Sequence, residues 1–426
     1  METIVIGAGL VLLALLGAPL FCVFGAVAML AFAGEGIDPS VIMVDLNRIA
    51  TNPTLVAIPL FTFAGYMLAE SKAPIRLVNL FRSIFGMIPG GLAVVALVTS
   101  ALFTAFTGAS GVTIIALGGL LYPMLLKEKY PEKFSLGLIT TSGSLGLLFA
   151  PSLPIILYAL IASISVDKLF AAGFIPGILL LLILAVYAVV QGRKFKLERH
   201  PFVWATVGAS LRAVAWEIPL PLVVIGGIYS GLFTATEAAA VTAFYVLIVE
   251  VFIYKDLKFF ADIPRVMRES MVLVGAILMI IGVAMGLTNY LVDQEVPNRL
   301  FEMTKTFISS PTMFLVVLNL FLIIVGMMMD IFSAIIVVVP LIKPIAQSYG
   351  IDPIHLGVIF LLNLEIGYLT PPVGLNLFIS SLRFGKPVFT VVRATLVYIG
   401  ILLVALVIVT YIPELSLWLV HAMNVK

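Results

Sequence analysis

The chain has 426 residues, of which 62% are hydrophobic and only 11% are charged, and its formal net charge is +2. Soluble proteins carry about 25% charged residues, so this composition excludes a soluble globular protein and indicates an all-helical protein that crosses a membrane several times. The net charge argues neither for nor against a nucleic-acid partner, but the sequence has no exposed basic domain that could hold one. The single cysteine, Cys22, excludes an intrachain disulfide.

The N-terminal part of the chain contains apolar runs of the roughly 20 residues that a membrane helix needs. The run Thr3–Ala33 is interrupted at Gly17 and Pro19, which allows one long tilted span or two short ones. It has no basic leader, so we expect a retained span rather than a signal peptide. Lys72–Phe85 mixes basic and large apolar residues in the pattern of an amphipathic helix at the membrane surface. Further spans are expected at residues 54–69 and 170–190.

The uncharged stretch Ser83–Leu126 contains the small residues Thr-Gly-Ala-Ser-Gly at positions 107–111. Glycine permits a tight turn, and hydroxyl groups can satisfy backbone groups that are freed inside a membrane. We therefore predict a hairpin of two half-helices over residues 91–126. The alternative is one long helix whose small residues allow close packing.

Proline interrupts two other apolar segments, residues 134–164 and residues 354–385. Proline lacks the N–H that a helix needs, and a helix broken at membrane depth survives only inside protein or along a wet cavity. The alternative is a kink that only shapes packing. Aligning Pro151 with Pro372 places Gly146 on Gly367 at the same offset of 221 residues.

The second half repeats the order of the first. Residues 311–349 resemble the first hairpin, with a tip at residues 326–330, and spans are expected at residues 216–233, 237–254, 269–292 and 390–412. Thr236 is expected to cap the helix that follows it. We therefore divide the chain into two repeats, residues 1–210 and residues 211–426. Interrupted spans at matching places in two halves indicate the binding site of a secondary transporter.

Eighteen of the 24 lysines and arginines lie in five segments, residues 72–82, 127–133, 193–212, 255–268 and 383–393. These segments are predicted to be cytoplasmic because positive charge is retained on that side. The first hairpin then enters from the cytoplasm and the second from outside, as inverted repeats require. A strict inversion would make the N-terminal run two short spans.

Two acids, Asp330 and Glu365, lie deep in apolar segments, where a charge costs at least about 2.5–3.5 kcal/mol. Asp330 could bind a cation, cap the next half-helix, or do both; the large apolar neighbours of Glu365 favour a structural role. Hard cations prefer oxygen ligands, and helix N-termini favour anions, so we predict two cation sites beside an anion site. The oxygen donors at the breaks are Ser110, Ser142, Ser144, Asp330, Asn363 and Thr370.

Enzymatic signatures are absent from the sequence. His200, His355 and His421 form no His-Glu-x-x-His pattern, and neither a phosphate-binding loop nor a Gly-x-Ser-x-Gly elbow occurs. We therefore expect a protein that is not an enzyme. A remote alternative is an intramembrane enzyme that uses Asp330 and Glu365 on lipid-linked substrates.

Residues 363–378, reading Asn-Leu-Glu-Ile-Gly-Tyr-Leu-Thr-Pro-Pro-Val-Gly-Leu-Asn-Leu-Phe, resemble a hallmark of the DctM-type large membrane subunit of tripartite ATP-independent periplasmic (TRAP) transporters. Residues 142–151, 233–240 and 326–330 match the family in the same order. The resemblance implies a sodium-coupled importer of a small organic acid in the bacterial inner membrane, with an elevator mechanism and an ion-transporter fold. It also implies a periplasmic binding protein and a small four-helix subunit, expected on a separate chain, besides membrane lipid. The alternative is a stand-alone organic-anion carrier coupled to protons or sodium.

The resemblance also implies at least two sodium ions and places their ligands at the breaks. The expected sodium positions are Ser110, Ser142, Gly143, Ser144, Gly326, Asp330 and Asn363. The expected substrate positions are Thr107, Gly108, Gly146, Pro151, Thr370, Pro371 and Pro372. The family often has Ser-Gly-Ser at the first tip, whereas this chain has Gly108-Ala109-Ser110, which removes one hydroxyl from the first sodium site.

Overall fold

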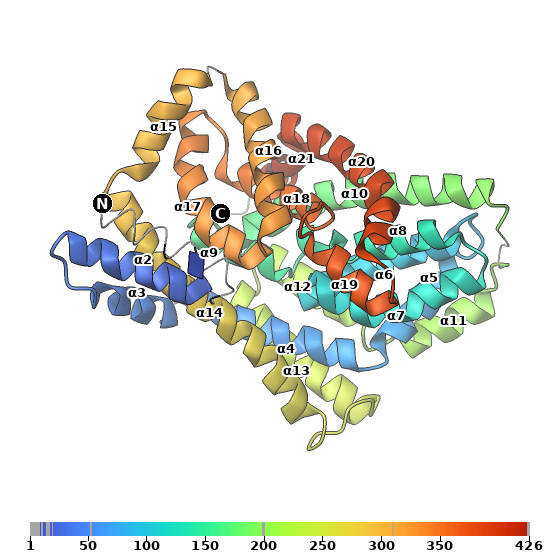
Figure 1. Ribbon diagram of the computed structural model, residues 1–426. Helices are drawn as coiled ribbons and strands as arrows, with labels where there is room; N and C mark the ends of the chain where they lie inside the picture. Colours follow the sequence, from blue (N-terminus) through green and yellow to red (C-terminus); the bar gives the residue numbers. More distant parts are fainter. Residues whose placement is uncertain are drawn as a thin grey trace.

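The computed structural model describes residues 20–51, 53–197, 201–308 and 310–423, together with residues 9, 12, 13 and 18. Within these ranges every regular element is a helix, and the helices form a thick bundle (Figure 1). Eight of the described helices are long and apolar enough to cross a membrane, or nine when one bent pair is taken as a single span. The predicted all-helical, polytopic architecture is confirmed.

The bounds of the helices follow the sequence predictions in most places. In the first half they are α2 (Leu20–Gly34), α3 (Val41–Ala50), η1 (Pro53–Val56), α4 (Ala57–Glu70), α5 (Ala73–Phe85), α6 (Gly91–Thr107), α7 (Ser110–Lys127), α8 (Glu132–Ser142), η2 (Leu145–Leu148), α9 (Leu153–Ile161) and α10 (Val166–Lys194). In the second half they are α11 (Trp204–Ala213), α12 (Pro219–Tyr229), α13 (Ala235–Ile248), η3 (Val249–Ile253), α14 (Ile263–Asp293), α15 (Val296–Phe307), α16 (Pro311–Met328), α17 (Ile331–Ser348), α18 (Pro353–Gly367), α19 (Leu375–Phe384), α20 (Val388–Tyr411) and α21 (Glu414–Ala422).

Four helices, α3, α11, α15 and α21, were not predicted, because each is short and lies outside the long apolar runs. The span predicted over residues 216–233 is a shorter helix, α12, which begins with Pro219 in its first turn and ends at Tyr229. Most of the N-terminal run before Leu20 lies outside the described residues, so the choice between one and two spans there is not tested.

The helix α13 shows how a local signal sets a boundary. Its cap is Thr234, whose side chain accepts a hydrogen bond from the Glu237 N–H while the Glu237 carboxylate accepts one from the Thr234 N–H. The prediction that Thr236 is the cap was wrong: the Thr236 hydroxyl donates to the Pro53 carbonyl oxygen at 2.9 Å. A threonine with a glutamate three residues later is the capping-box pattern, and it selects Thr234.

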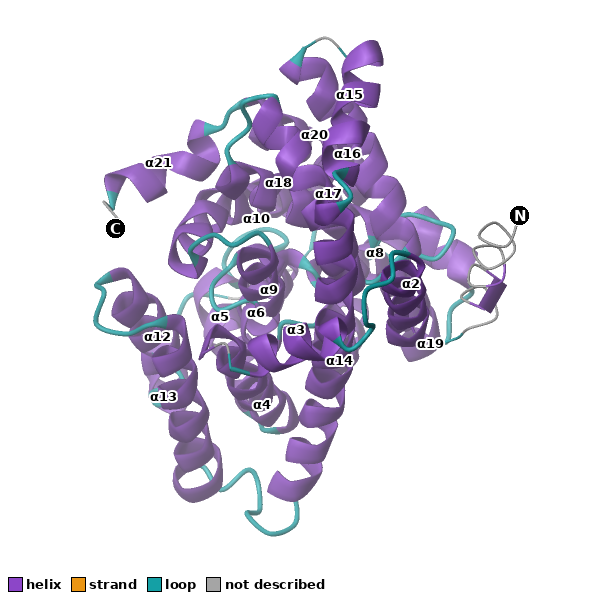
Figure 2. Cartoon of the chain, turned by 90° about the vertical axis from the view of Figure 1, so that its left-hand side faces the viewer, coloured by secondary structure: helices purple, strands orange, loops and turns teal. Residues whose placement is uncertain are grey.

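The helices form two groups. The half-helices α6 and α7 pack with α8, η2 and α10, and this body continues through α18, α19 and α20. In the other group, α4 lies between α13 and α14, and α14 continues along α2 and α3 (Figure 2). Contacts of α4 with α6, and of α14 with α17, join the two groups.

The segments predicted to be cytoplasmic lie together in the fold. Ion pairs join Lys72 to Asp256, Arg82 to Glu128, and Lys386 to Glu132. The Phe134 and Phe195 rings, 5.8 Å apart between centroids, bring the end of α10 to the start of α8. This grouping is what one membrane face requires; that this face is the cytoplasmic one stays a prediction.

Candidate functional site

The stretch predicted as the first hairpin consists of two helices, α6 and α7, which are joined at Gly108. Helix α6 ends at Thr107, Gly108 has a left-handed backbone with φ of 64°, and α7 begins at Ser110. A side chain at Gly108 would lie 2.5 Å from the Leu153 side chain, so this tip rests on the start of α9. The alternative of one continuous helix over this stretch was wrong, because glycine supplies the positive φ that ends α6.

In the first broken helix the helical structure stops and restarts, whereas a kink would only bend a continuous helix. Helix α8 stops at Ser142, the short turn η2 follows, and α9 starts at Leu153 at an angle of 46° to the preceding part. The peptide bond before Pro151 is cis. A Cβ atom on Gly146 would lie 2.3 Å from the Ala101 carbonyl oxygen, so η2 crosses α6 in backbone contact.

The second hairpin turns at Met329 and Asp330, between α16 and α17. One carboxylate oxygen of Asp330, Oδ1, accepts hydrogen bonds from the Phe332 and Ser333 N–H groups at 3.0 and 3.1 Å. The other, Oδ2, accepts one from the Ser333 hydroxyl at 2.5 Å. The capping role predicted for Asp330 is therefore confirmed; the cation-binding role is a separate prediction.

The second hairpin tip rests on the second broken helix. Helix α18 stops at Gly367 and α19 starts at Leu375, and the Gly374 N–H donates to the Met327 carbonyl oxygen at 3.2 Å. A Cβ atom on Gly367 would lie 2.5 Å from the Gly326 Cα. Each half thus places a glycine-lined hairpin tip against a proline-broken helix.

A chain of buried hydrogen bonds joins the breaks of the two halves. The Ser110 hydroxyl donates to Asn376 Oδ1 at 2.8 Å, and the Asn376 amide donates to the Thr140 carbonyl oxygen at 3.4 Å. The Thr140 hydroxyl donates in turn to Ser380 at 2.9 Å. Asn376 was not among the predicted site residues, although it lies within the motif of residues 363–378. Its place as the second residue of α19, just after the break, is the signal that could have singled it out.

Several buried oxygens at these breaks lack a hydrogen-bond partner among the described residues. Ser142 and Ser144 are satisfied by Ser100 and by the Thr141 carbonyl, respectively. The unpartnered atoms are the hydroxyls of Thr99, Thr107, Thr141 and Ser152, Asn363 Oδ1, and both carboxylate oxygens of Glu365. Buried polar atoms are rarely left unpaired, so each of these oxygens is available to a bound ligand or an ordered water.

Glu365 is the most unusual member of this set. It is 1% exposed on α18, and Ser144 faces its carboxylate without a hydrogen bond of normal geometry. No cluster of three His, Cys, Asp or Glu side chains that could hold a transition metal exists within the described ranges.

The close approach of Gly367 to Gly326 gives the first testable prediction. Gly367→Ala is expected to lower the free energy of unfolding by about 1–3 kcal/mol, because the added methyl group overlaps backbone atoms that cannot move without separating α16 from α18. The measurement is the thermal midpoint of the purified protein. Gly400→Ala on α20, where nothing lies within 4 Å of the new methyl group, is the matched control and should be neutral or slightly stabilising. Equal midpoints for the two variants would contradict the close packing of the tip.

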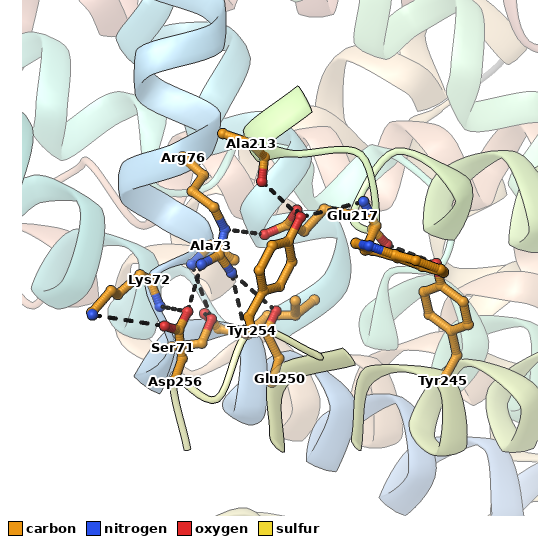
Figure 3. A network of polar contacts seen from close by, with 12 residues as sticks. Ser71, Lys72, Ala73, Arg76, Ala213, Glu217, Tyr245, Glu250, Tyr254 and Asp256 are labelled. Atoms are coloured by element: carbon orange, nitrogen blue, oxygen red, sulfur yellow. Dashed lines mark hydrogen bonds and ion pairs between the residues drawn. The ribbon is translucent and has the colours of Figure 1, made fainter. Parts of the chain in front are cut away.

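A second polar cluster lies away from the breaks and surrounds Arg76 on α5 (Figure 3). The guanidinium contacts Glu217, lies 2.5 Å from Asp256 and 3.2 Å from Glu250, and sits 3.9 Å from the Tyr254 ring centre. Burial opposes the charge of Arg76, but its hydrogen bonds to Asp256 and Glu217 outweigh that and raise its pKa. The cluster ties α5 to the segments before α12 and after α13. Sequence reasoning missed it because its members are far apart along the chain.

Comparison with known proteins gives one consistent result. A family model described as "Tripartite ATP-independent periplasmic transporter, DctM component" matches residues 7–415. The chain is 39% identical to the C4-dicarboxylate TRAP transporter large permease protein DctM of Pseudomonas aeruginosa over 397 residues, 92% of each chain. It is 31% identical to the isethionate TRAP transporter permease protein DctMQ of Oleidesulfovibrio alaskensis, covering 94% of this chain and 64% of that protein. In fold it is similar to the Alcanivorax borkumensis YdaH transporter, with a TM-score of 0.60, 14% identity and 88% coverage of both chains.

Proposed function

The chain belongs to the DctM family of tripartite ATP-independent periplasmic transporters, and we propose from this that it is the permease through which a sodium gradient drives import of a small organic anion. It is a multi-pass inner-membrane protein, and its relatives are named as transporter permeases rather than enzymes. Two of the relatives are named for C4-dicarboxylates and for isethionate, and both are small organic anions, whereas others are named for ectoine, a zwitterion.

The helix termini at the breaks support an anionic substrate. Helices α7 and α19 both begin at a break, and the Ser110–Asn376 hydrogen bond holds their first turns together. Helix N-termini carry unpaired N–H groups and partial positive charge, which favour an anion. The proposed substrate positions remain those expected from the sequence. Among them Pro371 and Pro372 are exposed, whereas Thr107, Gly108, Gly146 and Pro151 are buried.

The proposal that sodium binds at the breaks is based on buried oxygens that have no hydrogen-bond partner among the described residues. Thr107, Thr141 and Asn363 each have a buried oxygen without a partner among the described residues. Thr141 lies on α8 beside Ser142, Asn363 is itself an expected sodium position on α18, and Thr107 is the last residue of α6, before Ser110. The expected ligands of the first half lie near one another, because a side chain on Gly143 would come within 3.3 Å of the Ser110 carbonyl oxygen. Ser110, Ser142, Gly143 and Ser144 would hold one ion, and Gly326, Asp330 and Asn363 another.

Alternating access by an elevator movement is supported by the repeated order of elements. Hairpin, broken helix and long helix occur as α6–α10 in the first half and as α16–α20 in the second. We propose that two inverted repeats, residues 1–210 and 211–426, supply re-entrant hairpins to one mobile body. The group of α4, α13 and α14 would form the scaffold against which it moves.

Two protein partners follow from the family. The name of the isethionate relative joins M and Q, and this chain matches only 64% of that protein. We propose that a smaller four-helix membrane subunit accounts for the remainder and that a periplasmic binding protein delivers the substrate. A stand-alone carrier would need neither partner.

Reconstitution in liposomes tests the proposal. With both partners present, uptake of a labelled C4-dicarboxylate or a related organic anion is expected only under an inward sodium gradient. Replacing sodium with potassium should abolish uptake, and omitting the binding protein should do the same. Uptake that persists without sodium would refute the coupling, and uptake by the large subunit alone would favour the stand-alone carrier.

A further inference from the structure

A basic cavity of about 430 Å³ opens beside α5, away from the helix breaks. Its cationic lining comes from three separate segments: Arg82 on α5, Lys127 and Lys129 at the end of α7, and Lys196 just after α10. Among the lining residues that the structure describes, the only carboxylate is that of Glu128, which forms an ion pair with Arg82. These described lining residues therefore carry a net charge of +3.

The cavity combines this charge with an apolar wall. Met124, Phe195 and Leu197 complete the lining. The backbones of Lys129 and Lys196 are both left-handed, with φ of 62° and 54°, at the turns that end α7 and α10. A site with several cations on one side and hydrocarbon on the other matches a molecule that has an anionic head and an apolar body.

The position of the cavity indicates where that molecule comes from. Helix α5 is the amphipathic helix predicted for the membrane surface, and the lining segments belong to the set predicted to be cytoplasmic by the distribution of lysine and arginine. Anionic lipids of the cytoplasmic leaflet are attracted to basic clusters at this depth, and basic pockets between helices on that side bind their headgroups.

We propose that this cavity binds the headgroup of an anionic phospholipid. The phosphate lies among Lys127, Lys129 and Lys196, and the glycerol and upper acyl chains lie against Met124, Phe195 and Leu197. The Arg82–Glu128 ion pair forms the boundary with α5, so one lipid contacts both the surface helix and the base of the first hairpin. The site is independent of the sodium and substrate positions.

Thermal stability of the purified chain in a neutral detergent tests this proposal without sodium gradient, substrate or partner. Dioctanoyl-phosphatidylglycerol is the probe, and dioctanoyl-phosphatidylcholine is the lipid control. Phosphatidylglycerol is expected to raise the midpoint and phosphatidylcholine to leave it unchanged. The triple variant Lys127→Gln, Lys129→Gln, Lys196→Gln is expected to bind about fivefold more weakly per removed charge, or roughly a hundredfold in all.

A matched variant removes three other cations. Lys258→Gln, Arg268→Gln, Arg393→Gln lowers the charge of the same membrane face by the same amount, and should bind phosphatidylglycerol like the wild type. If the triple variant does not fold, native mass spectrometry of the single variant Lys196→Gln gives a second measurement of phosphatidylglycerol binding. Equal shifts by both lipids, or unchanged binding by the triple variant, would overturn the proposal. A shift of equal size by inorganic phosphate would assign the cavity to a soluble phosphate instead.

Discussion

Replacing Arg76 with methionine is expected to lower the free energy of unfolding by about 3–5 kcal/mol. Arg76 is the shared partner of Glu217, Glu250 and Asp256, whose side chains are 4%, 0% and 6% exposed. Methionine keeps much of the volume but leaves these carboxylates without the cation that compensates their burial. An uncompensated buried charge costs more than the lost attraction alone, because the remaining partners cannot be rehydrated.

Arg265 on α14 supplies a matched control. It also contacts three carboxylates, those of Glu70, Asp262 and Glu269, but all four side chains are 30–41% exposed. Solvent screens such pairs, so Arg265→Met should cost no more than about 1 kcal/mol. Equilibrium unfolding of both variants in mixed detergent micelles compares them directly. Similar losses for Arg76→Met and Arg265→Met would show that burial does not govern the Arg76 cluster.

Neutralising the acids distinguishes two causes of the stability loss in Arg76→Met: buried carboxylates left without a cation, and the lost packing of the arginine side chain. In the Arg76→Met background, the additional changes Glu217→Gln and Glu250→Gln should recover part of the lost stability, because replacing a whole buried charge set is often nearly neutral. The same two changes in the wild-type background should be destabilising, because they remove partners that Arg76 needs. Absence of recovery would assign the loss to packing of the arginine stem.

The breaks could be predicted from the sequence because each depends on local chemistry. Proline at positions 151 and 372 removes helix donors whatever surrounds it, and Gly108 permits the positive φ that ends α6. The repeat added independent support, since the same elements recur at a nearly constant offset. The capping role of Asp330 was equally local, because its partners are two and three residues away.

The remaining features depend on how distant segments pack, and no local pattern encodes that. Arg76 meets acids that are 141 to 180 residues away, and Ser110 meets Asn376 across 266 residues. The unpartnered Glu365 carboxylate is also a tertiary property: the sequence shows its apolar neighbours along the chain, but its lack of a partner appears only once η2 lies against α18.

The Asp330→Asn variant is expected to abolish stabilisation by sodium while it preserves the start of α17. Asparagine caps a helix about as well as aspartate, so its side-chain oxygen can accept from the Phe332 and Ser333 N–H groups as Asp330 does. What the variant removes is the negative charge at the proposed second cation site. A ligand that binds only the folded state at a hundred times its dissociation constant contributes about 2.7 kcal/mol, and that contribution should disappear.

The measurement is the thermal midpoint in sodium chloride against potassium chloride at equal ionic strength. Asp352→Asn is the matched control, because Asp352 caps α18 through the Ile354 and His355 N–H groups in the same way and lies away from the hairpin tips. Asp352→Asn should keep the sodium response, whereas Asp330→Asn should lose it at an unchanged potassium midpoint. If both variants respond to sodium like the wild type, Asp330 is a helix cap only, and sodium must be held by the unpartnered oxygens of Asn363 and Glu365 instead. If the wild type itself does not respond, sodium is not the coupling ion, and a proton gradient becomes the driving force to test.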